Sequence, residues 1–145
     1  MKYFDHMTDT TLCAHILQGL DILHDQIQRN DADMPATDLI LVLQSLSALR
    51  RNGPLSETAA DEIGRIESLL DQAISQETLG FRNVFDGIED PELGAVGRVR
   101  AVPVLSEKGA ALDRLLKGFR QFLAMRNLLA ARVDSRLMVN RKIAA

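Results

Sequence analysis

The residue best placed to do chemistry is a histidine, His15, in the run 14–20. The apolar positions around it recur at helical spacing, with a stripe that centres near Ile16 and Leu20. On that helix His15 lies toward the polar side, and Gly19 lies one turn later on the same face. Gln18, three positions on, offers a polar group for phosphate oxygens. An exposed imidazole with no side chain beside it is the layout of a phospho-accepting histidine.

These seven residues are similar to the A-H-x-L-K-G motif of histidine-containing phosphotransfer domains, which are also helical bundles. The resemblance implies that His15 accepts a phosphoryl group. Gln18 stands where that family usually has a lysine. A histidine phosphotransfer protein that uses His15 is therefore the alternative hypothesis for function.

The sequence contains few residues that could form another kind of chemical site. Three histidines and one cysteine, Cys13, favour neither a metal site nor a nucleophile, and phosphate-binding and hydrolase motifs are missing. We therefore expect no cofactor, no metal and no enzymatic activity. The single cysteine, the lack of an apolar leader and the lack of an 18-residue apolar run predict a cytoplasmic protein that does not contact membranes.

Charge is distributed unevenly along the chain, whose net charge is -3. Residues 1–97 are strongly acidic and residues 98–145 strongly basic. Either the two halves pack together and screen each other, or the basic segment meets an anionic partner. Its free basic face would comprise Arg114, Lys117 and Arg132. The sequence pI of about 5.6 makes nucleic-acid binding through this face the less favoured interpretation.

The patterning predicts an all-α fold, an antiparallel bundle of about four helices that forms one domain over residues 1–145. The helices are expected to begin at Thr8 or Asp9, at residues 35–38, at Ser56 and at Ser106. The third helix is expected to end near Leu79. Residues 80–105 are expected to form an irregular loop, because glycines and Pro103 argue against a sheet.

The last helix, over about 106–141, is longer than the others. At 1.5 Å per residue it spans roughly 50 Å, against roughly 35 Å for the third. Arg126 falls within its apolar stripe, so it either forms an internal ion pair, for example with Glu77, or sets the register of an interface. The helix either breaks near Arg126 or is covered by another chain. The expected partner-binding residues are Arg126, Leu129, Val133, Leu137 and Met138.

These features predict a non-enzymatic helical protein-binding module that acts through its amphipathic C-terminal helix. An adaptor, an assembly or secretion chaperone, or a small regulatory subunit would fit. The helix would bind a protein partner or a second copy of the chain as a homodimer.

Overall fold

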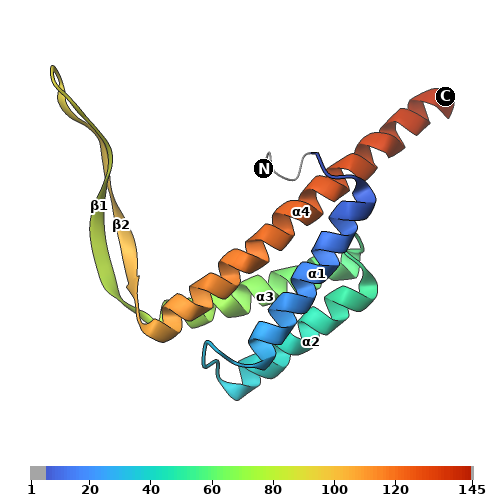
Figure 1. The fold of residues 1–145 in the computed structure, drawn as a ribbon, viewed down its shortest axis with the longest axis horizontal. Coiled ribbons are helices and arrows are strands. Elements are labelled where there is room, and N and C mark those ends of the chain that lie inside the picture. The colour runs from blue at the N-terminus through green and yellow to red at the C-terminus, as the bar shows by residue number, and fades with distance from the viewer. Residues whose placement is uncertain (1–5, 145) are drawn as a thin grey trace.

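A computed structural model describes the backbone of residues 6–144 and the side chains of residues 6–139. Four helices form an antiparallel bundle, and a two-stranded β-ribbon projects from one end of it (Figure 1). The helices are α1 (Asp9–Gln28), α2 (Ala36–Asn52), α3 (Glu57–Gln76) and α4 (Glu107–Ala144). Each helix packs against the next along the chain, and α4 closes the ring against α1.

Helix boundaries follow the polar residues that the sequence places beside each apolar stripe. Thr8 caps α1, its hydroxyl oxygen accepting from the amide of Thr11 at 3.2 Å. Ser56 caps α3 by accepting from the amide of Ala59 at 3.1 Å. Gly53 follows α2 with a φ of 79°, a conformation that a residue with a side chain adopts only at a cost. The four predicted helices are confirmed, although α3 ends at Gln76 rather than near Leu79.

The core lies along the axis of the bundle, where all four helices contribute large apolar side chains. The two phenylalanines of α4, Phe119 and Phe122, are each 1% exposed, and their rings stack at a centroid distance of 5.5 Å. Buried leucines and isoleucines of the other three helices surround them: Leu12, Ile16, Leu20, Leu23, Ile27, Leu46, Leu49, Ile63, Ile66 and Leu70.

The prediction of an all-α fold with an irregular loop at 80–105 is wrong. This segment forms β1 (Thr78–Asp90) and β2 (Gly94–Leu105), which pair as an antiparallel hairpin, so the fold is α+β. Pro103 is tolerated because a two-stranded ribbon has two free edges, where an absent N–H breaks no ladder bond. The hairpin is therefore an ordered insertion between two helices that pack directly against each other.

Two features of the hairpin depend on particular residues. At its turn the Asp90 carboxylate accepts from the amides of Glu92 at 2.8 Å and Leu93 at 3.1 Å. Toward the tip of the ribbon, Gly87 pairs with Gly97. A Cβ on Gly87 would lie 2.2 Å from the carbonyl oxygen of Val96, so the close approach of the strands excludes any side chain there.

No helix among the residues that the structure describes is long and apolar enough to cross a membrane. Residues 1–5, on which the predicted lack of an apolar leader depends, lie outside the described residues.

Candidate protein-interaction surfaces

Two elements extend beyond the helical core. The ribbon leaves the bundle where α3 ends and α4 begins, and the last turns of α4 leave it at the opposite end (Figure 1). Helix α4 is continuous through Arg126, so the predicted alternative of a break is not observed. Its 38 residues span about 57 Å at 1.5 Å per residue, whereas the 20 residues of α3 span about 30 Å.

The distal part of α4 emerges gradually from the core. Leu129, one of the partner-binding residues expected from the sequence, is only 2% exposed and packs within the bundle. Its side chain is therefore not available to a partner. Val133 is half-buried. Leu137 and Met138 are 51% and 62% exposed, and the adjacent Val139, which the sequence reasoning did not include, is 54% exposed. The exposed apolar group of α4 thus comprises Leu137, Met138 and Val139.

Two arginines of α4 hold the start of α1. Arg132 donates to the carbonyl oxygen of Met7 at 2.5 Å and lies 3.4 Å from an Asp9 carboxylate oxygen. Arg136 donates to the other oxygen of Asp9. The hydrogen bond from Arg136, aided by Arg132, keeps the pKa of Asp9 below its ordinary value although partial desolvation acts in the opposite direction. Arg132 therefore belongs to an internal contact and not to a free basic face.

The other two members of the predicted basic face are exposed. Lys117 forms an ion pair with Asp113 one turn earlier at 2.9 Å, and Arg114 forms no ion pair with the described residues. Among the described residues, five ion pairs join the basic half to the acidic half, as the screening interpretation of the sequence expects. They are Arg100–Asp86, Lys108–Glu77, Arg120–Asp71, Arg132–Asp9 and Arg136–Asp9.

Arg126 does not pair with Glu77, the internal partner suggested from the sequence. Glu77 lies at the base of the ribbon, where it accepts from the hydroxyl of Ser106 at 2.7 Å and lies 3.7 Å from the amino group of Lys108. Arg126 is partly buried, and its Nε has no hydrogen-bond partner among the described residues. A buried donor without a partner has an energetic cost.

The two faces of the ribbon differ in character, because successive side chains of a strand point to opposite sides. The strand register places two sets of paired residues on these faces. Over residues 81–85 and 99–103 we call one the uncharged face: Phe81, Asn83, Phe85, Val99, Ala101 and Pro103; nearer the tip the same side carries Gly87, Glu89, Ala95 and Gly97. We call the other the charged face: Arg82, Val84, Asp86, Ile88, Val96, Arg98, Arg100 and Val102, with an ion pair between Asp86 and Arg100.

The uncharged face is strongly exposed. Phe81 is 71%, Phe85 45% and Val99 64% exposed. An isolated two-stranded hairpin is marginally stable in water, and grouped exposed apolar side chains of this kind mark interaction sites. The ribbon is therefore the second surface of the chain that lacks cover within the described residues.

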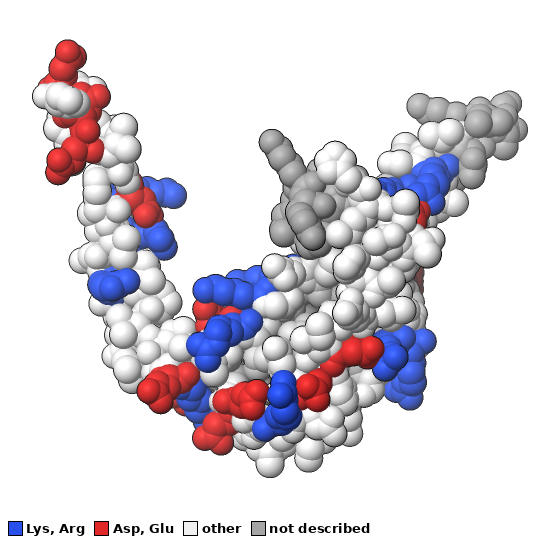
Figure 2. Space-filling view, viewed as in Figure 1, with Lys and Arg blue, Asp and Glu red and all other residues white. Residues whose placement is uncertain are grey.

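Charge is also polarised along the ribbon, as Figure 2 shows. The tip carries three carboxylates, Glu89, Asp90 and Glu92. The shaft below it carries three arginines and one aspartate, which are Arg82, Arg98, Arg100 and Asp86. The acidic tip disfavours insertion of the ribbon into nucleic acid, since it would meet phosphates.

His15 lies on the outer surface of α1, and both it and Gln18 are exposed. A Cβ built on Gly19 meets nothing within 4 Å, so the space next to the imidazole is open. These positions match the layout inferred from the sequence.

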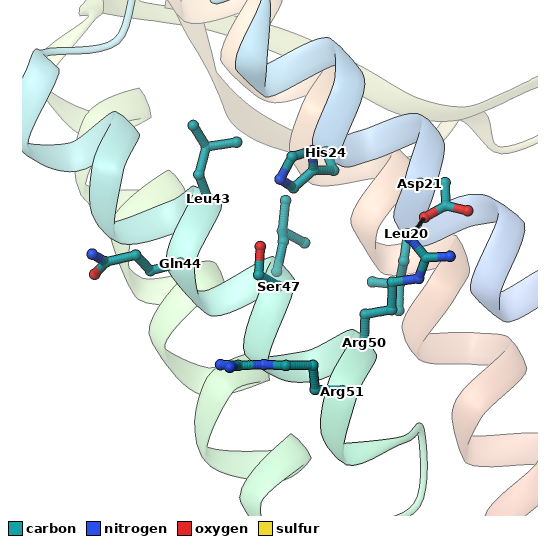
Figure 3. Close-up of a pocket in the computed structure, with 9 residues that line it drawn as sticks. Leu20, Asp21, His24, Leu43, Gln44, Ser47, Arg50 and Arg51 are labelled. Atoms are coloured by element: carbon teal, nitrogen blue, oxygen red, sulfur yellow. Dashed lines mark ion pairs between the residues drawn. The ribbon is translucent and has the colours of Figure 1, made fainter.

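A groove of about 650 Å³ lies between α1 and α2 (Figure 3). An ion pair between Arg50 and Asp21, at 2.8 Å, spans it. His24 and Ser47 both line the groove. The pairing of Asp21 with Arg50 leaves Arg51 as the unpaired cation of this groove among the described residues.

The sequence reasoning missed Phe81, Phe85 and Val99 as interaction residues. A signal for them was present. Two segments rich in β-branched and aromatic residues flank the turn 90–94, which begins Asp-Pro and ends in Gly, and this is a hairpin pattern. Both segments carry apolar residues on both faces, which obscures the alternation of a half-buried strand.

Comparison of the chain with protein-family models, with curated protein sequences and with solved structures finds no match. The surfaces described above are therefore interpreted from their own chemistry.

Proposed function

We propose that this chain is a non-enzymatic protein-binding module that engages another protein through the distal end of α4. The observation that carries the proposal is the exposed apolar group Leu137, Met138 and Val139, which lies beyond Leu129, the last buried residue of the helix. An adaptor, an assembly or secretion chaperone, or a small regulatory subunit would fit this proposal.

The anchoring of α4 supports this role for its end. Arg132 and Arg136 contact the start of α1, so the helix is held to the bundle up to this point. The following turn is presented on a helix that is already ordered, which lowers the entropy cost of binding. Helix-to-helix or helix-in-groove binding fits such a presentation.

The charge of the segment favours an acidic partner. Arg136 is followed in the sequence by Arg141 and Lys142, with Asp134 as the single acidic residue in this stretch. An amphipathic helix with acidic flanks would bury its apolar face against Leu137 and Met138, and its charge would complement the net positive charge of this stretch of the sequence. We infer a partner of this chemistry.

The proposal is tested by comparing two variants in tagged purifications from the native host. The double variant Leu137→Asp/Met138→Asp is expected to lose a stoichiometric partner that the unaltered chain retains. Ile40→Asp is the matched control, because Ile40 is 55% exposed on α2, close to the 51% of Leu137. Retention of the partner by the double variant, or its loss from the control as well, would refute binding through α4.

Histidine phosphotransfer remains the alternative proposal. The open space at Gly19 beside the exposed His15 supports it, whereas Gln18 supplies no positive charge for a phosphoryl group. Incubation with a phosphodonor is expected to yield acid-labile phosphate on the unaltered chain and none on His15→Gln. If the unaltered chain shows no phosphohistidine with any donor, the alternative is rejected.

A further inference from the structure

We propose that the chain self-associates by pairing the outer edge of β1 with the same edge of a second copy, so that two ribbons form one four-stranded antiparallel sheet. The occupant of the edge is a second copy of the same chain, related to the first by a two-fold axis beside Val84. The ribbon lies at the opposite end of the bundle from the tip of α4, so the inference does not rest on the proposed function.

The two edges of the ribbon differ in their capacity to accept a further strand. Strand β2 carries Pro103, which has no N–H to donate and interrupts any ladder along its outer edge. Strand β1 contains no proline in its 13 residues. Near the base of the ribbon, β1 lies on the side turned away from α4 (Figure 1). The edge of β1 is therefore the open one, and the proline-bearing edges of β2 end the sheet at four strands.

Alternate residues of β1 turn their backbone N–H and C=O groups away from β2. A Cβ on Gly87 would lie 2.7 Å from the Cα of Gly97, and so close an approach is typical of a pair that exchanges no ladder bonds. In steps of two along the register, Phe81–Pro103 is a pair of the same kind, which fits the missing N–H of the proline. The residues whose backbone groups point outward are therefore Phe81, Asn83, Phe85 and Gly87.

One register of the two β1 edges places opposite charges against each other. With the axis beside Val84, Arg82 of each copy lies opposite Asp86 of the other copy, on the charged face. An axis at residue 83 or 85 places Arg82 opposite Val84 or Ile88 instead, and an axis at residue 82 or 86 places like charges opposite each other. Charge complementarity thus selects the axis beside Val84. In this register the four outward residues pair with one another, 81 with 87 and 83 with 85.

Both charges are available for this contact. Arg82 is exposed and forms no ion pair with the described residues, and its neighbour across the ribbon is the uncharged Val102. The Oδ2 atom of Asp86 pairs with Arg100, and the Asp86 side chain is 44% exposed. Its other carboxylate oxygen can therefore accept a hydrogen bond from Arg82 of the second copy.

The same register also brings aromatic residues together on the opposite side of the sheet. Phe81 lies opposite Gly87 of the second copy, and the ring of Phe85 extends over that glycine. A Cβ on Gly87 would lie 2.8 Å from the Cζ of Phe85. Phe81 of each copy therefore meets Phe85 of the other, and such cross-strand aromatic contacts stabilise sheets. The contact covers rings that are 71% and 45% exposed in the single chain.

Sedimentation velocity of the full chain over a wide concentration range gives the first test. The unaltered chain is expected to shift from monomer to dimer as concentration rises. Asn83→Pro removes an outward N–H of β1 and is expected to abolish the dimer. Ala101→Pro is the matched control, because Ala101 is exposed like its register partner Asn83 but turns its N–H to the edge of β2. The control is expected to keep the dimer, and circular dichroism should show unchanged helix content in both variants.

Disulfide trapping tests the position of the axis. In a chain that carries Cys13→Ala, Val84→Cys is expected to form a disulfide-linked dimer with oxidised glutathione. Residues on the axis face each other at a Cα separation of about 4.5–5.5 Å, which suits a disulfide. Val102→Cys is the control, because Val102 is also a half-buried valine on the charged face but belongs to β2. This control is expected to stay largely unlinked.

The charge pair is tested by removing one arginine at a time. Arg82→Ala is expected to raise the dissociation constant of the dimer about threefold to tenfold, because it removes two exposed ion pairs of modest strength. Arg98→Ala, at an exposed arginine of the same face on β2, is expected to change it by less than about twofold. A chain that stays monomeric at every concentration, equal effects of the two prolines or of the two arginine substitutions, or equal crosslinking at 84 and 102 would each overturn the proposal.

Discussion

Glu77 and Ser106 are joined twice, although 28 residues lie between them in the sequence. The carbonyl oxygen of Glu77 accepts from the Ser106 amide at 3.0 Å, and its carboxylate accepts from the Ser106 hydroxyl at 2.7 Å. The Ser106 hydroxyl oxygen in turn accepts from the amide of Gly109 at 3.1 Å, which caps α4. The ribbon therefore projects from a connection between α3 and α4 whose two ends are hydrogen-bonded to each other.

From this closed connection we predict that the bundle folds without the ribbon. Replacing residues 79–104 by a short glycine-containing loop should leave the helix content and the cooperative unfolding of the bundle unchanged, because the core residues all belong to helices and the connections between them. Circular dichroism and thermal unfolding measure both. A non-cooperative transition in the shortened chain would mean that the ribbon is needed for the bundle to fold.

We predict opposite effects for the same substitution at two helical glycines. Ala usually stabilises a helix by about 1 kcal/mol relative to Gly, and Gly64→Ala should do so because a Cβ there meets nothing within 4 Å. Gly109→Ala should instead lower the free energy of unfolding, because its Cβ would lie 2.8 Å from the Cβ of Glu77. Denaturant unfolding of the two variants checks the signs. If both substitutions raise the free energy of unfolding, the contact between residue 109 and Glu77 relaxes enough to accept a Cβ.

The helices could be predicted from the sequence because their signals are local. Thr8 and Ser56 are caps, and Gly53 ends α2, each readable from a few neighbouring residues. The ribbon could not be predicted in the same way. Pro103 and Gly97 normally argue against a strand, yet Pro103 fits a ribbon with free edges and Gly97 fits the close approach of the strands.

The interaction surfaces were predictable only in part, because exposure depends on tertiary packing. The sequence shows that Leu129 and Leu137 share the apolar character of α4, but it does not show that the bundle ends between them. It likewise could not show that Arg132 contacts Met7 and Asp9, which are more than 120 positions earlier in the chain. Contacts at such separations leave no periodicity in the sequence.

Where Gly87 pairs with Gly97, we predict that Gly87→Ala disrupts the part of the ribbon between this pair and the tip. Its Cβ would lie 2.2 Å from the carbonyl oxygen of Val96 and 2.7 Å from the Cα of Gly97, so the strands must separate. Cross-strand nuclear Overhauser effects between 88–90 and 94–96 should disappear while the helical signals stay in place. Gly80→Ala is the control, because a Cβ there meets nothing within 4 Å. Unchanged cross-strand effects in Gly87→Ala would contradict the close approach.

In the core we predict that Arg126→Met stabilises the protein. The buried Nε of Arg126 lacks a hydrogen-bond partner in the described structure, and an unsatisfied buried donor costs about 1–3 kcal/mol. Methionine fills a similar volume without that donor. Arg120→Met, at a side chain that is 55% exposed, should change stability by less than about 0.5 kcal/mol. Denaturant unfolding measures the change. If Arg126→Met is less stable than the unaltered chain, Arg126 makes a favourable contact in the folded protein.

The contact between α4 and the start of α1 should depend on pH. Arg136, aided by Arg132, lowers the pKa of Asp9 in the folded chain, so the ionised carboxylate stabilises the fold above the unfolded pKa of about 3.9. This stabilisation is lost as pH falls through the lower folded pKa, where Asp9 becomes protonated. Asp9→Asn should therefore melt at a lower temperature than the unaltered chain at neutral pH, and the difference should vanish in acid. Asp134→Asn, an acidic position of α4 with no ion pair among the described residues, is the control. A difference for Asp9→Asn that persists in strong acid would show that the Asp9 charge is not its source.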